Sequence, residues 1–398
     1  MDWREIVINF DFEYNCSGCS ACFNICSVNA IEMKSNSVGF LFPVLNEEKC
    51  IKCGKCETVC PHLNKTQYIG NKRNIKGVWL YSSKNEKAKI RSSSGGACYE
   101  LGLSIIKAGG YICGCAWNEE LKAMHIIGND ERTLESIQGS KYLQSDIGSS
   151  YKDIYALLEA DKKVIFTGTP CQATAMHNFV MNNSNGKYRD QLIIIAVICH
   201  GVASPMVWES YKKWILKKTG SHLIKVNFRD KTKRGYKQSY CRYELQNGTV
   251  YYQPTFLPSS KYIEATIIYN LAIRNSCSRC DCKGIITSTD LIIGDWYAAY
   301  KGEGCLGTSC IVAATDRGQQ FALKNLSGLK DFFYEDIRKK NNMVEKSISP
   351  AANRDKFFEN ISDYNYWDRV EELYPPKYKY KKLIVKMGLY GAIKKIIG

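Results

Sequence analysis

Eight cysteines in the first 61 residues repeat one spacing twice. Each half has the form Cys-x2-Cys-x2-Cys-x3-Cys, and the residues are Cys16, Cys19, Cys22, Cys26, Cys50, Cys53, Cys56 and Cys60. In this spacing, which is that of bacterial ferredoxins, three thiolates of one loop cap one face of a four-iron cubane and the fourth binds the neighbouring cluster. The pattern therefore predicts electron-transfer chemistry.

The two halves are expected to share their ligands between two 4Fe-4S clusters. Cys16, Cys19, Cys22 and Cys60 would bind one cluster, and Cys50, Cys53, Cys56 and Cys26 the other. Structural zinc and a disulfide framework are the alternatives, but neither normally produces this four-cysteine spacing twice. The first half ends in Ser27 where the second has Pro61, a proline that only helps to turn the chain.

Length and composition set the limits of the molecule. A chain of 398 residues exceeds a dicluster module, so one or two larger domains must follow. Its content of 45% hydrophobic and 24% charged residues is ordinary for a globular protein, and no segment has the roughly 18 consecutive apolar residues of a membrane span. The amino terminus lacks the apolar region of a secretory signal, so the 19 cysteines are expected in a reducing cytoplasm.

The charge is strongly positive, with 55 Lys and Arg against 39 Asp and Glu and a formal net charge of +16. This excess favours an anionic partner, such as a nucleotide, ferredoxin or another acidic redox protein, or a membrane surface. Nucleic acid is not expected, because no helix-turn-helix, zinc-finger or RNP-like pattern accompanies the charge. Beyond residue 372 the chain has seven lysines and no acid. That tail predicts either a peripheral membrane contact or a docked terminal helix.

Hydrophobic patterns beyond residue 72 predict alternating strands and helices. Residues 77–82 have the pattern of a strand and residues 97–107 that of a helix. Residues 163–170 and 192–198 have the pattern of buried strands, and a helix follows each of them. Two consecutive strand-loop-helix units imply a parallel sheet, so the core is expected to be α/β.

A loop rich in serine and glycine, Arg91-Ser-Ser-Ser-Gly-Gly96, leads into the expected helix at 97–107. Unpaired backbone N–H groups and the positive end of the helix dipole make such a junction a ready phosphate site, and glycine permits close approach. The alternative is a plain helix cap with a tight turn.

Four cysteines outside the repeat occupy similar structural positions. Cys171 and Cys199 each follow a predicted parallel strand, and Cys277 and Cys280 lie in a loop before another strand. Because adjacent parallel strands bring their exits together, these thiols are expected to meet and bind a third 4Fe-4S cluster. Taken separately, the first two would be buried thiols and the second pair a zinc site. Cys282 is the expected substitute ligand.

The order of the motifs resembles that of one protein family. The dicluster segment is followed by Arg91-Ser-Ser-Ser-Gly-Gly, Gly139-Ser-Lys-Tyr, Thr167-Gly-Thr-Pro-Cys-Gln172, Cys199-His-Gly201, Cys277-x2-Cys280 and Gly294-Asp295-Trp296. Over roughly residues 10 to 320, the chain resembles the beta-subunit family of coenzyme F-420 hydrogenases and dehydrogenases. The resemblance implies an α/β (α+β) flavoprotein core of that type, preceded by a bacterial dicluster ferredoxin-like domain, with FAD as cofactor. It also supports the third cluster, because members without the dicluster are still iron-sulfur flavoproteins.

The resemblance also assigns the FAD contacts, motif by motif. They are Arg91, Ser93, Ser94, Gly95, Gly96, Gly139, Ser140, Lys141, Tyr142, Thr167, Gly168 and Thr169. Asp295 lies in the Gly-Asp-aromatic motif, but an aspartate after a strand is equally explained as a cap. The catalytic acid and base stay unassigned.

These features predict an iron-sulfur flavoprotein oxidoreductase. A ferredoxin-like carrier would supply electrons through 4Fe-4S clusters to FAD, which can release them as hydride to a small acceptor; the reverse direction is equally allowed. Acceptor classes left open are a sugar nucleotide or other envelope precursor, a soluble metabolite, a tetrapyrrole and coenzyme F-420 itself. The alternative is a non-catalytic electron-transfer subunit of a larger complex.

The predicted organisation has four regions. Residues 1–71 form the dicluster domain and residues 72–162 the FAD-binding amino-terminal part of the core. Residues 163–340 form the carboxy-terminal part of the core with the third cluster, and residues 341–398 a helical, basic extension.

Overall fold

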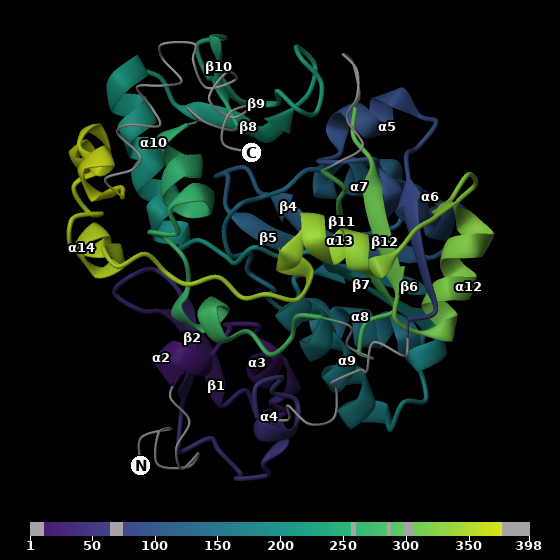
Figure 1. Ribbon diagram of the computed structural model, residues 1–398. Helices are drawn as coiled ribbons and strands as arrows, with labels where there is room; N and C mark the ends of the chain where they lie inside the picture. Colours follow the sequence, from purple (N-terminus) through teal and green to yellow (C-terminus); the bar gives the residue numbers. More distant parts are fainter. Residues whose placement is uncertain (1–11, 64–74, 256–259, 285–287, 298–305, 376–398) are drawn as a thin grey trace.

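One eight-stranded sheet dominates the computed structural model, which describes residues 12–63, 75–255, 260–284, 288–297 and 306–375 (Figure 1). Its strands are β3 (Gly77–Tyr81), β4 (Tyr111–Trp117), β5 (Ala123–Gly128), β6 (Val164–Gly168), β7 (Leu192–Val197), β11 (Leu291–Asp295), β12 (Ser309–Ala313) and β13 (Lys330–Asp331). They lie in the order β13-β3-β12-β11-β7-β6-β4-β5. The strands predicted at 77–82, 163–170 and 192–198 are confirmed as β3, β6 and β7.

The sheet is mixed, although the sequence predicted a parallel one. Its central strands β4, β6, β7 and β11 are parallel, with Phe166 of β6 opposite Ile194 of β7. Strands β5, β12, β3 and β13 extend it through antiparallel pairs. Strand β12 is buried along its whole length, and such a strand has a continuous apolar sequence whichever way it runs, so the sequence could not show its direction.

Helices cover both faces of this sheet. One face carries α8 (Ser150–Glu159), α9 (Pro170–Ser184) and α13 (Tyr334–Lys340), and the other carries α6 (Ala97–Lys107), α7 (Glu131–Ile137) and α12 (Asp316–Asn325). Along β6, Val164 and Phe166 point into the first core and Ile165 into the second, and all three are fully buried. Successive strand side chains alternate between faces, so each face needs its own apolar cover.

A second layer of structure lies beside the sheet (Figure 1). Strands β8 (Leu223–Asp230), β9 (Tyr240–Leu245) and β10 (Val250–Pro254) form an antiparallel sheet. Helix α10 (Pro205–Thr219) packs on it, with the ring centroids of Trp208 and Phe228 5.4 Å apart. Helix α14 (Arg354–Glu359) adds Phe357, and the turn after it adds Trp367 to the same aromatic core. The lysine-rich tail from residue 376 lies outside the described residues.

Shorter helical segments complete the described chain. They are α5 (Glu86–Arg91), α11 (Lys261–Ile263), a π-helix at Glu264–Ile268, and 3-10 turns at Arg189–Gln191, Asn275–Arg279, Asn342–Val344, Tyr364–Asp368 and Val370–Leu373. No helix among the described residues has the length and hydropathy needed to span a membrane.

The amino-terminal cysteine region is a small unit packed against the large one. It contains α2 (Phe12–Asn15), α3 (Ala21–Ile25) and α4 (Lys55–Thr58), with an antiparallel hairpin of β1 (Ile31–Ser35) and β2 (Leu41–Leu45). Ala21, Ile25 and Val59 join the core under α8 and α9. The Asn178 amide of α9 donates to the Val59 carbonyl at 3.1 Å. The cysteine loops are therefore held against the sheet domain.

Candidate redox site

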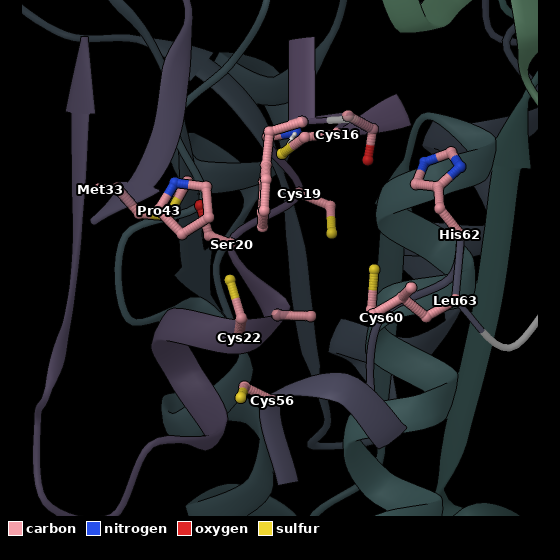
Figure 2. Close-up of a pocket in the computed structure, with 14 residues that line it drawn as sticks. Cys16, Cys19, Ser20, Cys22, Met33, Pro43, Cys56, Cys60, His62 and Leu63 are labelled. Carbon is pink, nitrogen blue, oxygen red and sulfur yellow. Dashed lines mark hydrogen bonds between the residues drawn. The ribbon is translucent and has the colours of Figure 1, made fainter. Parts of the chain in front are cut away.

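Five cysteines of the amino-terminal region line one hollow (Figure 2). They are Cys16, Cys19, Cys22, Cys56 and Cys60. Figure 2 shows the sulfur atoms of Cys19, Cys22 and Cys60 directed into the same space. Much of the remaining lining is apolar, including Phe12, Met33, Pro43 and Leu63. A group bound in this hollow would have several thiolate ligands and little contact with water.

The two cysteine loops have the same backbone conformation at equivalent positions. The residue two positions after the first cysteine, Gly18 or Lys52, has a positive φ of 64° or 54° and donates its N–H to that cysteine's sulfur at 3.4 Å. The residue after the second cysteine, Ser20 or Gly54, is also left-handed, with φ of 61° and 71°. N–H groups directed at sulfur stabilise the thiolate form and tune iron-sulfur clusters. Both loops therefore fit the same kind of metal group.

Burial makes these thiols hard to ionise without a cation. It raises the pKa of Cys60 to about 11, with Cys16 and Cys56 adding to the effect. Burial also raises the pKa of Cys22 well above its usual range. Thiolate, not thiol, binds metal, so several thiolates in one hollow require a strongly cationic partner. An iron cluster meets that requirement.

Three buried polar atoms beside the hollow have no hydrogen-bond partner in the described part of the chain. They are Ser17 Oγ, Ser20 Oγ and His62 Nε2, and all three residues line the hollow. Buried polar atoms are nearly always paired, so these atoms fit a site that holds an additional polar group. All cysteines in the described ranges are free thiols, and the disulfide framework considered as an alternative is not formed there.

The other cysteines of the repeat lie nearer the surface. Cys53 is exposed, while Cys26 and Cys50 are half-buried. The Cys26 sulfur accepts a backbone N–H at 3.2 Å. Burial raises the pKa of Cys56 to about 11, and the charges of Cys53 and Cys50 contribute. Cys56 thus lies at the boundary between the hollow and the second ligand set, to which the spacing assigns it.

The four cysteines predicted for a third cluster lie within electrostatic range of one another at the carboxyl edge of the sheet. Cys171 is in the first turn of α9, directly after β6, and Cys199 follows the neighbouring parallel strand β7. Cys277 lies in the 3-10 turn at 275–279, and Cys280 directly follows it. Cys282 is buried and contacts both Cys171 and Cys280.

The charges of these thiols interact with one another. Burial raises the pKa of Cys199, and Cys277, Cys171 and Cys280 add to the rise. A hydrogen bond with Cys282 lowers the pKa of Cys280. The structure thus brings the four predicted thiols within electrostatic range and adds Cys282 as a fifth.

This second thiol group adjoins the hollow of the amino-terminal region. Burial raises the pKa of Cys19, and the charge of Cys171 is among the further causes. The Cys171 sulfur is 3.2 Å from the Thr169 hydroxyl at the end of β6. Thiol sites therefore continue from the dicluster loops to the edge of the main sheet.

The predicted flavin segments also meet at this edge. The hydroxyls of Ser93 and Ser140 are 2.7 Å apart, and the Ser140 N–H donates to Ser93 Oγ at 2.7 Å. Ser94 donates to the Thr308 carbonyl, just before β12, at 2.6 Å. Thr167 is the last residue but one of β6, and its carbonyl lies 3.1 Å from the His125 ring. The Ser/Gly loop thus contacts Ser140 and Thr308, which are far from it in the sequence.

Several of the predicted flavin side chains already have protein partners. Arg91 forms an ion pair with Glu135. The Lys141 ammonium donates to three carbonyls at the end of α7 and acts as a helix cap. Thr167 donates to a carbonyl of β4, and Thr169 caps α9 in a capping box. These side chains have structural roles, so any flavin contact from these positions would come mainly from their backbone.

The glycines of these segments differ in how much space surrounds them. A Cβ added at Gly95 would lie 2.4 Å from Tyr81 O and 2.6 Å from Ser309 N, so this glycine is needed for packing alone. At Gly139, where φ is 82°, the nearest atom to an added Cβ is Arg91 O at 3.7 Å. Gly96 caps α6 without a side-chain hydrogen bond. At Gly96 an added Cβ would lie 3.2 Å from Ser83 Cβ, so of these three glycines only Gly139 leaves room for a bound phosphate or flavin.

A buried ionic cluster lies beside these segments, and the sequence did not predict it. Arg229 Nη1 is 3.2 Å from both Asp295 Oδ2 and Tyr142 Oη, and the Tyr236 hydroxyl donates to Asp295 at 2.7 Å. The Lys231 ammonium donates to a carbonyl of the Ser/Gly loop at 2.9 Å. Charged residues at the end of β8 have the pattern of an exposed turn, so no sequence signal revealed them. Asp295, whose role was open, is the partner of a buried arginine.

Two segments of the chain match the models of known protein families. Residues 15–64 match the family model of the 4Fe-4S dicluster domain. Residues 161–327 match the family model for the C terminus of the beta subunit of coenzyme F420 hydrogenase/dehydrogenase. This segment of the chain is therefore similar to the carboxy-terminal part of that beta subunit. The resemblance predicted from the motifs is thereby confirmed, and the iron-sulfur character of the amino-terminal domain with it.

Individual proteins of this type are distant from the chain. The F subunit of the F(420)H(2) dehydrogenase of Methanosarcina mazei is 22% identical over 289 residues, which is 70% of this chain and 75% of that protein. A chain of the xenon-derivatised F420-reducing NiFe hydrogenase complex of Methanosarcina barkeri is 15% identical, with a TM-score of 0.44. That match covers 68% of this chain and 89% of the hydrogenase chain. The resemblance to this family rests on the two domain matches.

Proposed function

We propose that the protein is an iron-sulfur flavoprotein oxidoreductase that exchanges electrons between a one-electron carrier and a small two-electron acceptor. The observation that carries this proposal is the continuity of thiol sites. Cys19 of the dicluster loops lies within electrostatic range of Cys171, which packs against Cys282 in the thiol group at the sheet edge. Redox centres that exchange electrons must lie close together, and a continuous series meets this need.

Each centre would have its own residues. The eight cysteines of the repeat would hold two 4Fe-4S clusters, and Cys171, Cys199, Cys277 and Cys280 a third. FAD would occupy the junction of the Ser/Gly loop with residues 139–142, through the open backbone at Gly139 and the Ser93–Ser140 hydroxyl pair. FAD, when bound, couples single-electron transfer to hydride transfer.

The residues around the proposed flavin site would control charge and water. Lys231 is almost fully buried and supplies positive charge beside the Ser/Gly loop. Positive charge at a flavin stabilises anionic phosphate and the added electrons. Asp295 and Tyr236 hold Arg229 in place through the ion pair and a hydrogen bond.

The partner and the acceptor follow from charge and family. A net charge of +16 suits an acidic donor such as a ferredoxin. Coenzyme F420 is one candidate acceptor, because the matching family and the M. mazei relative both carry its name. In that case the chain would act as a subunit of a larger complex. A sugar nucleotide or another envelope precursor is the other candidate class.

The proposal is tested by anaerobic purification of the full chain. We expect about twelve irons and one FAD per chain, from three four-iron clusters and one flavin site. The double variant Ser93→Ala/Ser140→Ala should lose most of its flavin and keep its iron, because it removes the hydroxyl pair at the junction. Ser104→Ala is the matched control, since that hydroxyl donates to the Leu101 carbonyl within α6. Protein that contains iron but never flavin, even after reconstitution with FAD, would identify an electron-transfer subunit without its own catalytic site.

A further inference from the structure

Arg274 is a fully buried arginine at the contact between the dicluster domain and the sheet domain. Its side chain is 0% exposed, and its Nε donates to the Cys16 carbonyl at 2.7 Å. Its Nη2 donates to the Leu41 carbonyl at 2.9 Å, and its Nη1 to Gln144 Oε1 at 2.9 Å. All three acceptors are neutral. Within the described ranges no carboxylate contacts this guanidinium.

The dicluster domain is shaped around this side chain. The guanidinium carbon lies 4.2 Å from the ring centroid of Phe42 and 5.1 Å from that of Phe40. A Cβ at Gly18, between two cysteines of the first loop, would be 2.8 Å from Arg274 Nη1. The Gln144 amide that accepts from Arg274 also donates to the Gly18 carbonyl, at 3.2 Å. Loop, aromatic rings and arginine therefore form one interlocked contact.

The same arginine is next to the second thiol group. The backbone N–H of Cys277 donates to the Arg274 carbonyl at 3.1 Å, so the two residues belong to one turn. Burial lowers the pKa of Arg274, and the nearby Cys16, Cys277 and Cys171 thiolates act in the opposite direction. These thiolates come from both ligand groups, one on each side of the domain contact.

A buried guanidinium stays charged, and a buried charge is costly unless an opposite charge lies nearby. Neutral carbonyls and aromatic faces orient a cation but do not neutralise it. The anionic groups closest to Arg274 are the cysteine thiolates. Four thiolates around a cubane leave a net negative charge, which grows by one when an electron is added.

We infer that Arg274 is the shared counter-charge of the two cluster sites on either side of the domain contact, and that it raises their reduction potentials. This inference rests on the proposed function for the cluster in the sheet domain, and for the dicluster side on the 4Fe-4S domain itself. A fixed positive charge stabilises the reduced form, which has one more negative charge, relative to the oxidised form. Arg274 thereby keeps both sites reducible by the same donor.

The test is an EPR-monitored redox titration of the full chain, with iron content measured on the same samples. Arg274→Gln should lower the potential of the cluster bound through Cys16 and that of the sheet-domain cluster. A tenfold change in the reduced-to-oxidised ratio at fixed potential corresponds to 59 mV for one electron, a readily resolved shift. Arg274→Lys keeps the charge and should keep both potentials. Arg354→Gln is the matched control, because Arg354 is also buried but has its own carboxylate, Asp355, at 3.2 Å.

Several outcomes of these titrations would overturn the inference about Arg274. Arg274→Gln with full iron and unchanged potentials would overturn the inference, as would equal shifts in Arg274→Gln and Arg274→Lys, because the charge would then be irrelevant. If Arg274→Gln loses its iron, Gln144→Glu supplies the test, because its carboxylate would pair with the Arg274 guanidinium and offset its charge. Unchanged cluster potentials in Gln144→Glu would also overturn the inference. A sample with about eight irons would refute the third cluster of the proposed function, while the shift at the Cys16 cluster would still be measurable.

Discussion

Replacement of Cys199 by alanine is the sharpest test of the third thiol group. Cys199 follows β7, and the charges that add to its raised pKa come from Cys277, Cys171 and Cys280. In the proposed function these four thiols are the complete ligand set of one cubane, so losing one should release all of its iron. We expect iron to fall from about twelve to about eight atoms per chain, while the dicluster and the flavin stay.

The measurement is iron content and the reduced-state EPR spectrum of anaerobically purified protein. Cys98→Ala is the matched control, because burial alone raises the pKa of Cys98 and no other thiol contributes. It should keep about twelve irons. Cys282→Ala tests the fifth thiol and should also keep them. Unchanged iron in Cys199→Ala together with loss of about four irons in Cys282→Ala would show that Cys282, not Cys199, is the ligand.

Three further predictions concern charge. Burial lowers the pKa of His125 to about 4, so stability present above pH 6.5 should fall by up to about 3 kcal/mol as the pH drops toward 4. Anaerobic urea unfolding at several pH values should therefore show a smaller loss of stability in His125→Gln than in the wild type, by about that amount. Asp290 is fully buried and 2.9 Å from Arg189, so Asp290→Asn should lower the free energy of unfolding by about 3–5 kcal/mol in the same assay. Asp190, the exposed partner of Arg317, supplies the control Asp190→Asn. A loss in Asp290→Asn no larger than in this control would contradict the prediction. Removal of residues 376–398 should abolish binding to anionic vesicles and its salt dependence if the tail is a membrane contact, whereas equal binding by both proteins would exclude that role.

The sequence determined the parts of this protein that depend on local spacing. The spacing of the cysteines between Cys16 and Cys60 specified two ferredoxin-type loops. Residues with left-handed backbone conformation lie at equivalent positions in both loops. Apolar runs located β6 and β7, and the order of motifs indicated the resemblance to the coenzyme F420 hydrogenase/dehydrogenase beta subunit. Such features are set by residues a few positions apart, which the sequence displays directly.

Tertiary structure decided what depends on long-range contacts. The sequence could not tell that β12 pairs antiparallel with β11, since a doubly buried strand has the same composition in either direction. It gave Arg274 and Arg229 no special status, because a buried arginine and a surface arginine look alike until their neighbours are known. The neighbours of Arg274, Cys16 and Gln144, stand 258 and 130 positions away in the chain. Charge in a protein acts through space, so only the folded chain shows which thiols and which cations share one site.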